Sequence, residues 1–200
     1  MVAPLFPGRL LGLANSLTML RIILIPVFVS LLVYRKVTAA LVVFCLASFT
    51  DLLDGYIART RGSQTRLGAF LDPLADKLLL AASFVTLTYL YPRLLPFWMT
   101  VTVLSRDLLL ILGTVLVHIA GGRVHPTPTR LGKASTAFQM VTVLAVLLVL
   151  AFGMDPRIKT ALVWITAGFT VASGIQYLYQ GTKLLNQPTD REPHVPTLVR

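Results

Sequence analysis

The chain has 200 residues, of which 56% are hydrophobic and 13% are charged, and its mean hydropathy is +0.77. A soluble domain carries roughly 45–50% apolar and about 25% charged residues, so this composition excludes an ordinary soluble globular protein and predicts a membrane protein. The net charge is +10, but the basic residues lie between apolar runs, which favours contact with anionic lipid headgroups or phosphate-bearing substrates over nucleic acid.

Six long apolar segments follow one another along the chain, each close to the ~20 residues that cross a bilayer. The predicted spans are 16–34, 37–60, 69–91, 95–120, 133–153 and 158–184. We therefore predict an all-α integral membrane protein with six transmembrane helices in a single domain, residues 1–185. Residues 1–14 predict a short interfacial helix, and the polar, proline-bearing residues 186–200 predict a disordered cytoplasmic tail.

The distribution of lysine and arginine predicts the orientation of these spans. Ten basic residues lie in the N-terminus, the loops after the second and fourth spans and the tail, whereas five lie in the other loops. Cytoplasmic loops carry an excess of lysine and arginine. We therefore expect a multi-pass protein of the cytoplasmic (inner) membrane, with both termini and the loop after the second span in the cytoplasm.

Residues 51–77, DLLDGYIARTRGSQTRLGAFLDPLADK, place four aspartates at the ends of two apolar segments: Asp51, Asp54, Asp72 and Asp76. A charge within a bilayer costs at least ~2.5–3.5 kcal/mol on insertion scales, so these carboxylates need partners. Their i,i+3 and i,i+4 spacings place each pair on one helix face, and the short loop makes the two helices antiparallel neighbours. Converging carboxylates repel one another unless cations neutralise them, and oxygen ligands favour Mg²⁺, Mn²⁺ or Ca²⁺.

The residues between these two aspartate pairs fit a phosphate ligand. Gly55, Ala58 and Gly68 are small enough for close approach, Arg59 is placed to meet phosphate, and a helix N-terminus favours anions. Metals flanked by arginine indicate a phosphoryl-type displacement. The alternative is an interhelical ion-pair network, in which Asp51 or Asp54 pairs with Arg59, and Asp76 pairs with Lys77 or Arg21.

Three further basic residues are candidates for an acceptor site. Arg21 either contacts substrate phosphate or the carboxylates, or extends to lipid headgroups. Arg106 lies mid-span beside Asp107, from which we expect it to point away, and it serves either the acceptor or a structural ion pair. Lys133 either contacts phosphate or only sets orientation. Aromatic residues near span ends, Tyr177 among them, predict an interfacial belt.

The stretch Asp51–Asp76 matches D-x2-D-G-x2-A-R-x8-G-x3-D-x3-D at every defined position, and so resembles the CDP-alcohol phosphotransferase (CDP-alcohol phosphatidyltransferase) family. The resemblance extends to residues 15–29, 67–79, 105–107 and 132–140, and it is greatest to the phosphatidylglycerophosphate synthases and cardiolipin synthases. It implies six transmembrane helices, a homodimer, and displacement of CMP from a CDP-activated alcohol such as CDP-diacylglycerol by an incoming hydroxyl.

The resemblance also implies roles for the motif residues. One divalent cation, Mg²⁺ or Mn²⁺, would be held by Asp51, Asp54 and Asp72. A second would be held by Asp51, Asp72 and Asp76. Asp72 and Asp76 would be catalytic, with Asp76 as the general base. The cytidine and diphosphate site would be lined by Gly55, Ala58, Arg59 and Gly68.

The acceptor that the resemblance implies is a glycerol-type alcohol, with glycerol 3-phosphate first. Phosphatidylglycerol is the alternative, because Thr114 and Ser135 stand where phosphatidylglycerophosphate synthases usually carry basic residues. A divalent-cation transporter explains the aspartates but not Gly55, Arg59 and Gly68, and is a remote alternative.

Overall fold

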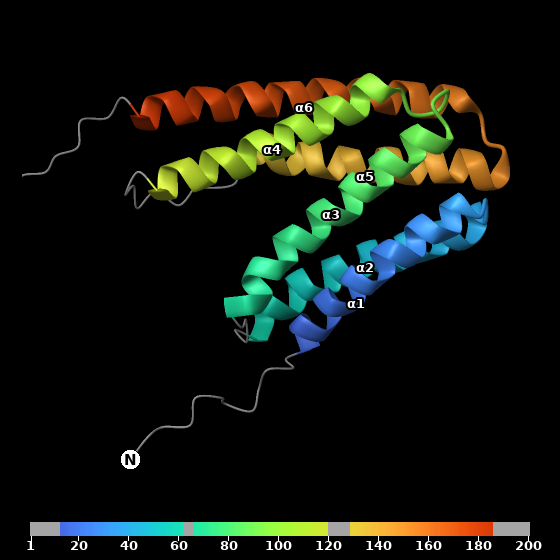
Figure 1. The fold of residues 1–200 in the computed structure, drawn as a ribbon, viewed down its shortest axis with the longest axis horizontal. Helices are drawn as coiled ribbons and strands as arrows, with labels where there is room; N and C mark the ends of the chain where they lie inside the picture. The colour runs from blue at the N-terminus through green and yellow to red at the C-terminus, as the bar shows by residue number, and fades with distance from the viewer. Residues whose placement is uncertain (1–12, 62–65, 120–128, 186–200) are drawn as a thin grey trace, which may run out of the picture.

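The computed structural model describes residues 13–61, 66–119 and 129–185, and side chains within 18–51, 74–113 and 129–181 apart from 156, 158 and 159. These residues form six α-helices and no strand (Figure 1). The helices are α1 (Leu13–Val33), α2 (Val37–Arg61), α3 (Arg66–Leu90), α4 (Phe97–Ile119), α5 (Arg130–Phe152) and α6 (Pro156–Leu185). The all-α prediction is confirmed, whereas the interfacial helix and the tail fall largely or wholly outside the described residues.

The beginning of α5 shows why some helices start before their apolar runs do. The side chain of Thr129 accepts a hydrogen bond from the Gly132 N–H at 3.0 Å, which caps the helix N-terminus. The polar segment from Arg130 therefore joins the helix, three residues before the predicted start. At the other end of α5, Gly153 has φ of 67°, a left-handed conformation that glycine adopts without strain, and it ends the helix.

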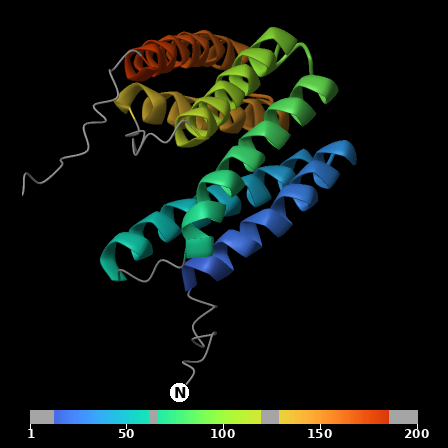
Figure 2. The ribbon, with the colours of Figure 1, turned by 60° about the vertical axis from the view of Figure 1, so that its left-hand side comes forward.

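The helices run alternately up and down, so their ends fall into two groups (Figure 1). The starts of α1, α3 and α5 and the ends of α2, α4 and α6 lie at one end of the bundle, which we call the site end; the opposite end is the core end. Helix α1 packs on α2 and α3, and α6 packs on α4 and α5. Helix α3 runs from the α1–α2 pair toward α4, and it joins these two groups together with α2–α5 contacts (Figure 2).

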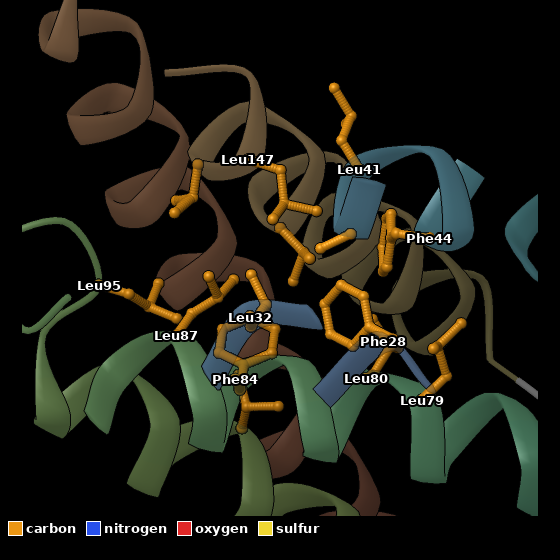
Figure 3. Packing of buried hydrophobic residues seen from close by; sticks show 14 of the residues in the cluster. Phe28, Leu32, Leu41, Phe44, Leu79, Leu80, Phe84, Leu87, Leu95 and Leu147 are labelled. Atoms are coloured by element: carbon orange, nitrogen blue, oxygen red, sulfur yellow. The ribbon is translucent and has the colours of Figure 1, made fainter. Parts of the chain in front are cut away.

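The apolar core lies at the core end. Its fully buried large side chains include Phe28, Leu32, Phe44, Phe84 and Leu147, from α1, α2, α3 and α5 (Figure 3). Phe28 and Phe44 contact each other with ring centroids 5.8 Å apart. Each side chain comes from the half of its helix that is remote from the site end. Apolar packing therefore stabilises the bundle where the motif residues are absent.

A row of polar side chains, the polar seam, joins α5 to α6. It comprises Ser135, Gln139, Thr142, Thr166, Thr170 and Ser173, all fully buried. The Thr142 and Thr166 hydroxyls lie 2.7 Å apart, and the Ser135 and Thr170 hydroxyls 3.1 Å apart. The sequence analysis missed this seam, although the signal was present: polar residues at i, i+4 and i+7 on both segments.

Large apolar side chains are exposed on all six helices, for example Ile23, Phe49, Tyr89, Phe97 and Trp164. Soluble monomers rarely expose so much apolar surface, so lipid is the fitting surrounding. By length and hydropathy, Arg130–Phe152 and Thr160–Gly181 qualify as membrane spans among the described residues, and Thr18–Val33 and Val37–Asp51 are shorter apolar helices. The prediction of six spans is thus met in part.

We expect the core and the polar seam to differ in their contribution to stability. Replacing the buried Phe84 by alanine should lower the free energy of unfolding by about 3–5 kcal/mol, because it leaves a cavity. Thr166→Val keeps the side-chain shape and leaves Thr142 bonded to the Phe138 carbonyl, so it should cost only about 0.6 kcal/mol. Unfolding of both variants in detergent micelles measures this difference, and equal losses would contradict it.

Candidate active site

Six ionisable side chains from α1 to α4 lie at the site end within the described residues, three cations and three carboxylates. They are Arg21, Asp51, Asp76, Lys77, Arg106 and Asp107. Charges in a low-dielectric interior must be paired or ligated, so their pairing determines what each can do.

Arg21 and Asp51 join α1 to α2. The Arg21 Nη1 atom lies 2.9 Å from Asp51 Oδ1, and the Arg21 side chain is 0% exposed. The hypothesis that Arg21 extends to lipid headgroups is therefore wrong, because a fully buried guanidinium does not reach the membrane surface. Its predicted contact with the carboxylates is confirmed for Asp51.

Asp76 has a carboxylate oxygen that makes no hydrogen bond among the described residues. Its Oδ1 atom is buried and makes no hydrogen bond there. The neighbouring Lys77 pairs with Asp107 on α4 instead, at 2.8 Å, so the alternative in which Asp76 forms an ion pair with Lys77 is wrong. A buried, unpartnered carboxylate oxygen is the arrangement expected of a ligand or a proton acceptor whose partner comes from outside the chain.

Asp107 accepts hydrogen bonds from two cations on the same oxygen. Arg106 Nη1 lies 2.7 Å from Asp107 Oδ1, and Lys77 Nζ lies 2.8 Å from that atom. The expectation that Arg106 points away from Asp107 is wrong, because the arginine side chain is long enough for its guanidinium to bind the carboxylate of the adjacent residue. The structural ion-pair interpretation of Arg106 is therefore confirmed, and its acceptor role stays a prediction.

Three further contacts fix the Arg106 guanidinium. Its Nη2 atom donates to Ser173 Oγ at 2.9 Å and to the Gly132 carbonyl at 3.4 Å, and its Cζ atom lies 5.7 Å from the centre of the Tyr177 ring. Tyr177 was predicted in the interfacial belt, yet it faces this buried cation. The missed signal is spacing, because Tyr177 follows Ser173 by four residues and continues the polar face of α6.

A side chain at Gly132 would press on the ends of neighbouring side chains. A Cβ atom there would lie 2.9 Å from Tyr177 Oη and 3.2 Å from Arg106 Nη2. The neighbouring predicted residues differ from each other: Lys133 is exposed, whereas Ser135 is fully buried and bonded to Thr170. The position of Ser135 thus provides neither a positive charge nor an exposed side chain to the site.

Several motif residues have described backbone but no described side chain. Asp54, Gly55, Ala58 and Arg59 lie in the last turns of α2, and Gly68 and Asp72 lie in the first turns of α3. Both stretches are at the site end, with Asp51 and Asp76. Among the described side chains, no three potential metal ligands converge, so the four-carboxylate cluster stays a prediction.

Known proteins with similar sequences indicate the family of this chain. The sequence profile described as CDP-alcohol phosphatidyltransferase matches residues 11–172. The human "Cardiolipin synthase (CMP-forming)" is 38% identical over 189 residues, covering 84% of this chain and 61% of that protein. The "CDP-diacylglycerol--glycerol-3-phosphate 3-phosphatidyltransferase" of Escherichia coli K12 is 38% identical over 174 residues, covering 84% of this chain and 93% of that protein.

A further relative is the "Probable phosphatidylglycerophosphate synthase" of Mycobacterium tuberculosis H37Rv, 35% identical over 180 residues, covering 86% of this chain and 82% of that protein. The chain thus spans about 61% of the length of the cardiolipin synthases, but most of the length of the other relatives. Since the matched profile covers α2, α3 and most of the other helices, the chain belongs to the CDP-alcohol phosphatidyltransferase family.

Proposed function

We propose that this protein transfers the phosphatidyl group of CDP-diacylglycerol to a glycerol-type acceptor and releases CMP, a step of phospholipid biosynthesis. The observation that carries the proposal is the buried, unpartnered Asp76 carboxylate oxygen at the site end, in a chain of this family. Asp76 closes the motif that begins at Asp51, and both belong to helices that end or begin there.

The donor half of the site consists of the motif residues. Asp51, Asp54, Asp72 and Asp76 would hold two divalent cations, Mg²⁺ or Mn²⁺, and the unpartnered Oδ1 atom of Asp76 fits such a ligand. Bound cations would neutralise the diphosphate and stabilise the CMP leaving group. Gly55, Ala58 and Gly68 would let the diphosphate approach the backbone, and Arg59 would pair with it. The Arg21–Asp51 ion pair would orient one ligand carboxylate, because the fully buried Arg21 holds it from α1.

The reaction needs one proton transfer, which we assign to Asp76. The acceptor hydroxyl oxygen attacks the phosphatidyl phosphorus, a new P–O bond forms, and the P–O bond to CMP breaks. Asp76 accepts the hydroxyl proton, for which its free oxygen is available, and Asp72 would assist as the second catalytic carboxylate.

Glycerol 3-phosphate is the acceptor that we favour. The support for this choice is the extent of the match, because the Escherichia coli relative that is named for that reaction matches this chain over 93% of its length. Phosphatidylglycerol is the second candidate. Its support is the buried, uncharged Ser135 and the commitment of Arg106 to Asp107 and Ser173, which leave fewer free cations for a phosphomonoester.

For the membrane arrangement, we propose that all six helices span the bilayer, because each of them exposes large apolar side chains. The site end would face the cytoplasm, because the lysine and arginine excess lies at that end. A homodimer would bury part of the apolar surface, as the resemblance implies.

Asp76→Asn should lower the rate of CMP release by at least about a hundredfold, because the amide neither takes a proton nor carries the charge that binds a cation. The matched control is Asp155→Asn, which changes the same chemical groups at an exposed position before α6, remote from the site end. CMP release from CDP-diacylglycerol in mixed micelles, with metal and acceptor present, is measured for both. Full turnover in Asp76→Asn would refute the assigned role.

Gly132→Ala should weaken acceptor binding, because the added methyl group would press on Arg106 Nη2 and Tyr177 Oη. We expect KM for the acceptor to rise on the order of ten- to a hundredfold, with KM for CDP-diacylglycerol unchanged. Gly168→Ala on α6 is the control, since a Cβ atom there meets nothing within 4 Å. Glycerol 3-phosphate and phosphatidylglycerol are offered separately, and lipid chromatography of the products decides between them. An unchanged KM for the acceptor would show that Arg106 takes no part in acceptor binding.

A further inference from the structure

We infer that Asp107 is a positioning residue that keeps the Lys77 ammonium away from Asp76, and thereby leaves the Asp76 carboxylate available to a divalent cation and to the acceptor proton. The inference rests on the proposed function for the role of Asp76. Asp107 lies outside the aspartate motif, but in this inference it controls how strongly Asp76, a motif residue, binds a metal ion.

The argument begins with how the charges at the site end are distributed. Arg21 pairs with Asp51, and both Lys77 and Arg106 pair with Asp107. Three cations are thus assigned to two carboxylates. The third carboxylate, Asp76, has an oxygen, Oδ1, that makes no hydrogen bond among the described side chains, even though Lys77 is its neighbour in sequence.

A cation can reach the carboxylate of an adjacent residue in this fold. Arg106 and Asp107 are consecutive in α4, and their side chains meet at 2.7 Å. The same relation holds between Asp76 and Lys77 in α3, in reverse order. The Lys77 charge also acts on the Asp76 carboxyl, so both carboxylates lie near the lysine, and its ammonium binds the one on α4.

Of the two cations on Asp107, Lys77 is the one that can move. Arg106 is 5% exposed and is also held by Ser173 and the Gly132 carbonyl. Lys77 is 26% exposed, and among the described residues it otherwise contacts the Thr136 hydroxyl, at 3.5 Å. If Asp107 lost its charge, the ammonium would turn to Asp76, the neighbouring described carboxylate with an oxygen that makes no hydrogen bond, because an uncompensated charge inside the bundle is strongly unfavourable.

A lysine bound to Asp76 would oppose catalysis in two ways. It would occupy the free carboxylate oxygen, and its positive charge would repel a divalent cation. Asp107 therefore influences the site without touching substrate or metal. Groups that orient or screen metal ligands in this manner commonly change metal affinity by about 10–100-fold when they are replaced.

The test compares Asp107→Asn with the double variant Lys77→Met/Asp107→Asn in the full chain, purified in detergent. Two quantities are measured: the Mn²⁺ concentration that gives half-maximal CMP release, and Mn²⁺ binding without substrate, followed by the electron paramagnetic resonance of free Mn²⁺. In Asp107→Asn we expect the half-saturating Mn²⁺ concentration to rise at least about tenfold, and binding to weaken equally. In the double variant, which lacks the competing ammonium, both should return to within about threefold of wild type.

Controls separate this role from a purely structural one. Lys77→Met alone should leave both quantities unchanged, and Asp107→Glu, which retains the charge, should bind Mn²⁺ nearly as well as wild type. A double variant as impaired as Asp107→Asn would overturn the inference, because the loss would then act through Arg106 or through the fold. If the wild type binds Mn²⁺ but releases no CMP, the proposed function fails, and the binding measurements still decide the role of Asp107.

A second pair of variants tests the same role of the negative charge from another position. Thr136→Asp/Asp107→Asn places a new carboxylate beside Lys77 without restoring the partner of Arg106, and Thr136→Asn/Asp107→Asn is its uncharged match. The variant with the carboxylate should bind Mn²⁺ at least about tenfold more tightly than its match. Equal Mn²⁺ binding in this pair would overturn the inference.

Discussion

The need to pair charges inside an apolar bundle determines how this structure is organised. Arginine, lysine and aspartate side chains cannot lie among lipid-facing helices unless each has a counter-charge or a ligand. Arg21 meets this need by binding Asp51 across α1 and α2, and Asp107 meets it for two cations from α3 and α4. These contacts hold the helices together at the site end, and the apolar core holds them together at the other end. The same charges that would destabilise an isolated helix thus determine which helices are neighbours.

The polar seam between α5 and α6 belongs to the same organisation. Its hydroxyl pairs run from Thr142 and Thr166 near the middle of the helices to Ser173, which binds Arg106. Interhelical hydrogen bonds of this kind contribute little stability each in a membrane, but they fix the register of two apolar helices that could otherwise slide. The register places Tyr177 and the side-chain-free Gly132 around the Arg106 guanidinium. Helix pairing and the geometry of the site are therefore determined by one set of residues.

Much of this arrangement could be predicted from the sequence, because hydropathy and motif spacing are local signals. Six helices were expected and are present, and the boundary of α5 differs because a threonine cap lies beyond the apolar run. Partners of the charged residues could not be predicted, since they depend on which helices meet. Lys77 has an aspartate next to it but binds Asp107, thirty positions away, and Arg106 binds the neighbour it was expected to avoid. Tyr177 was predicted in the interfacial belt because it lies near the end of a span. Its spacing of four residues from Ser173, however, indicated that it faces the interior.

The separation of core end and site end has an evolutionary consequence. The apolar side chains that stabilise the bundle, such as Phe28, Phe84 and Leu147, belong to the helix halves remote from the aspartates. Lys133 and Ser135, which lie near the site end on α5, are not part of that apolar packing. Substitutions near the site end can therefore accumulate with little loss of the stability that the apolar core provides. This suits a family whose members carry different names, "Cardiolipin synthase (CMP-forming)" and "CDP-diacylglycerol--glycerol-3-phosphate 3-phosphatidyltransferase" among them.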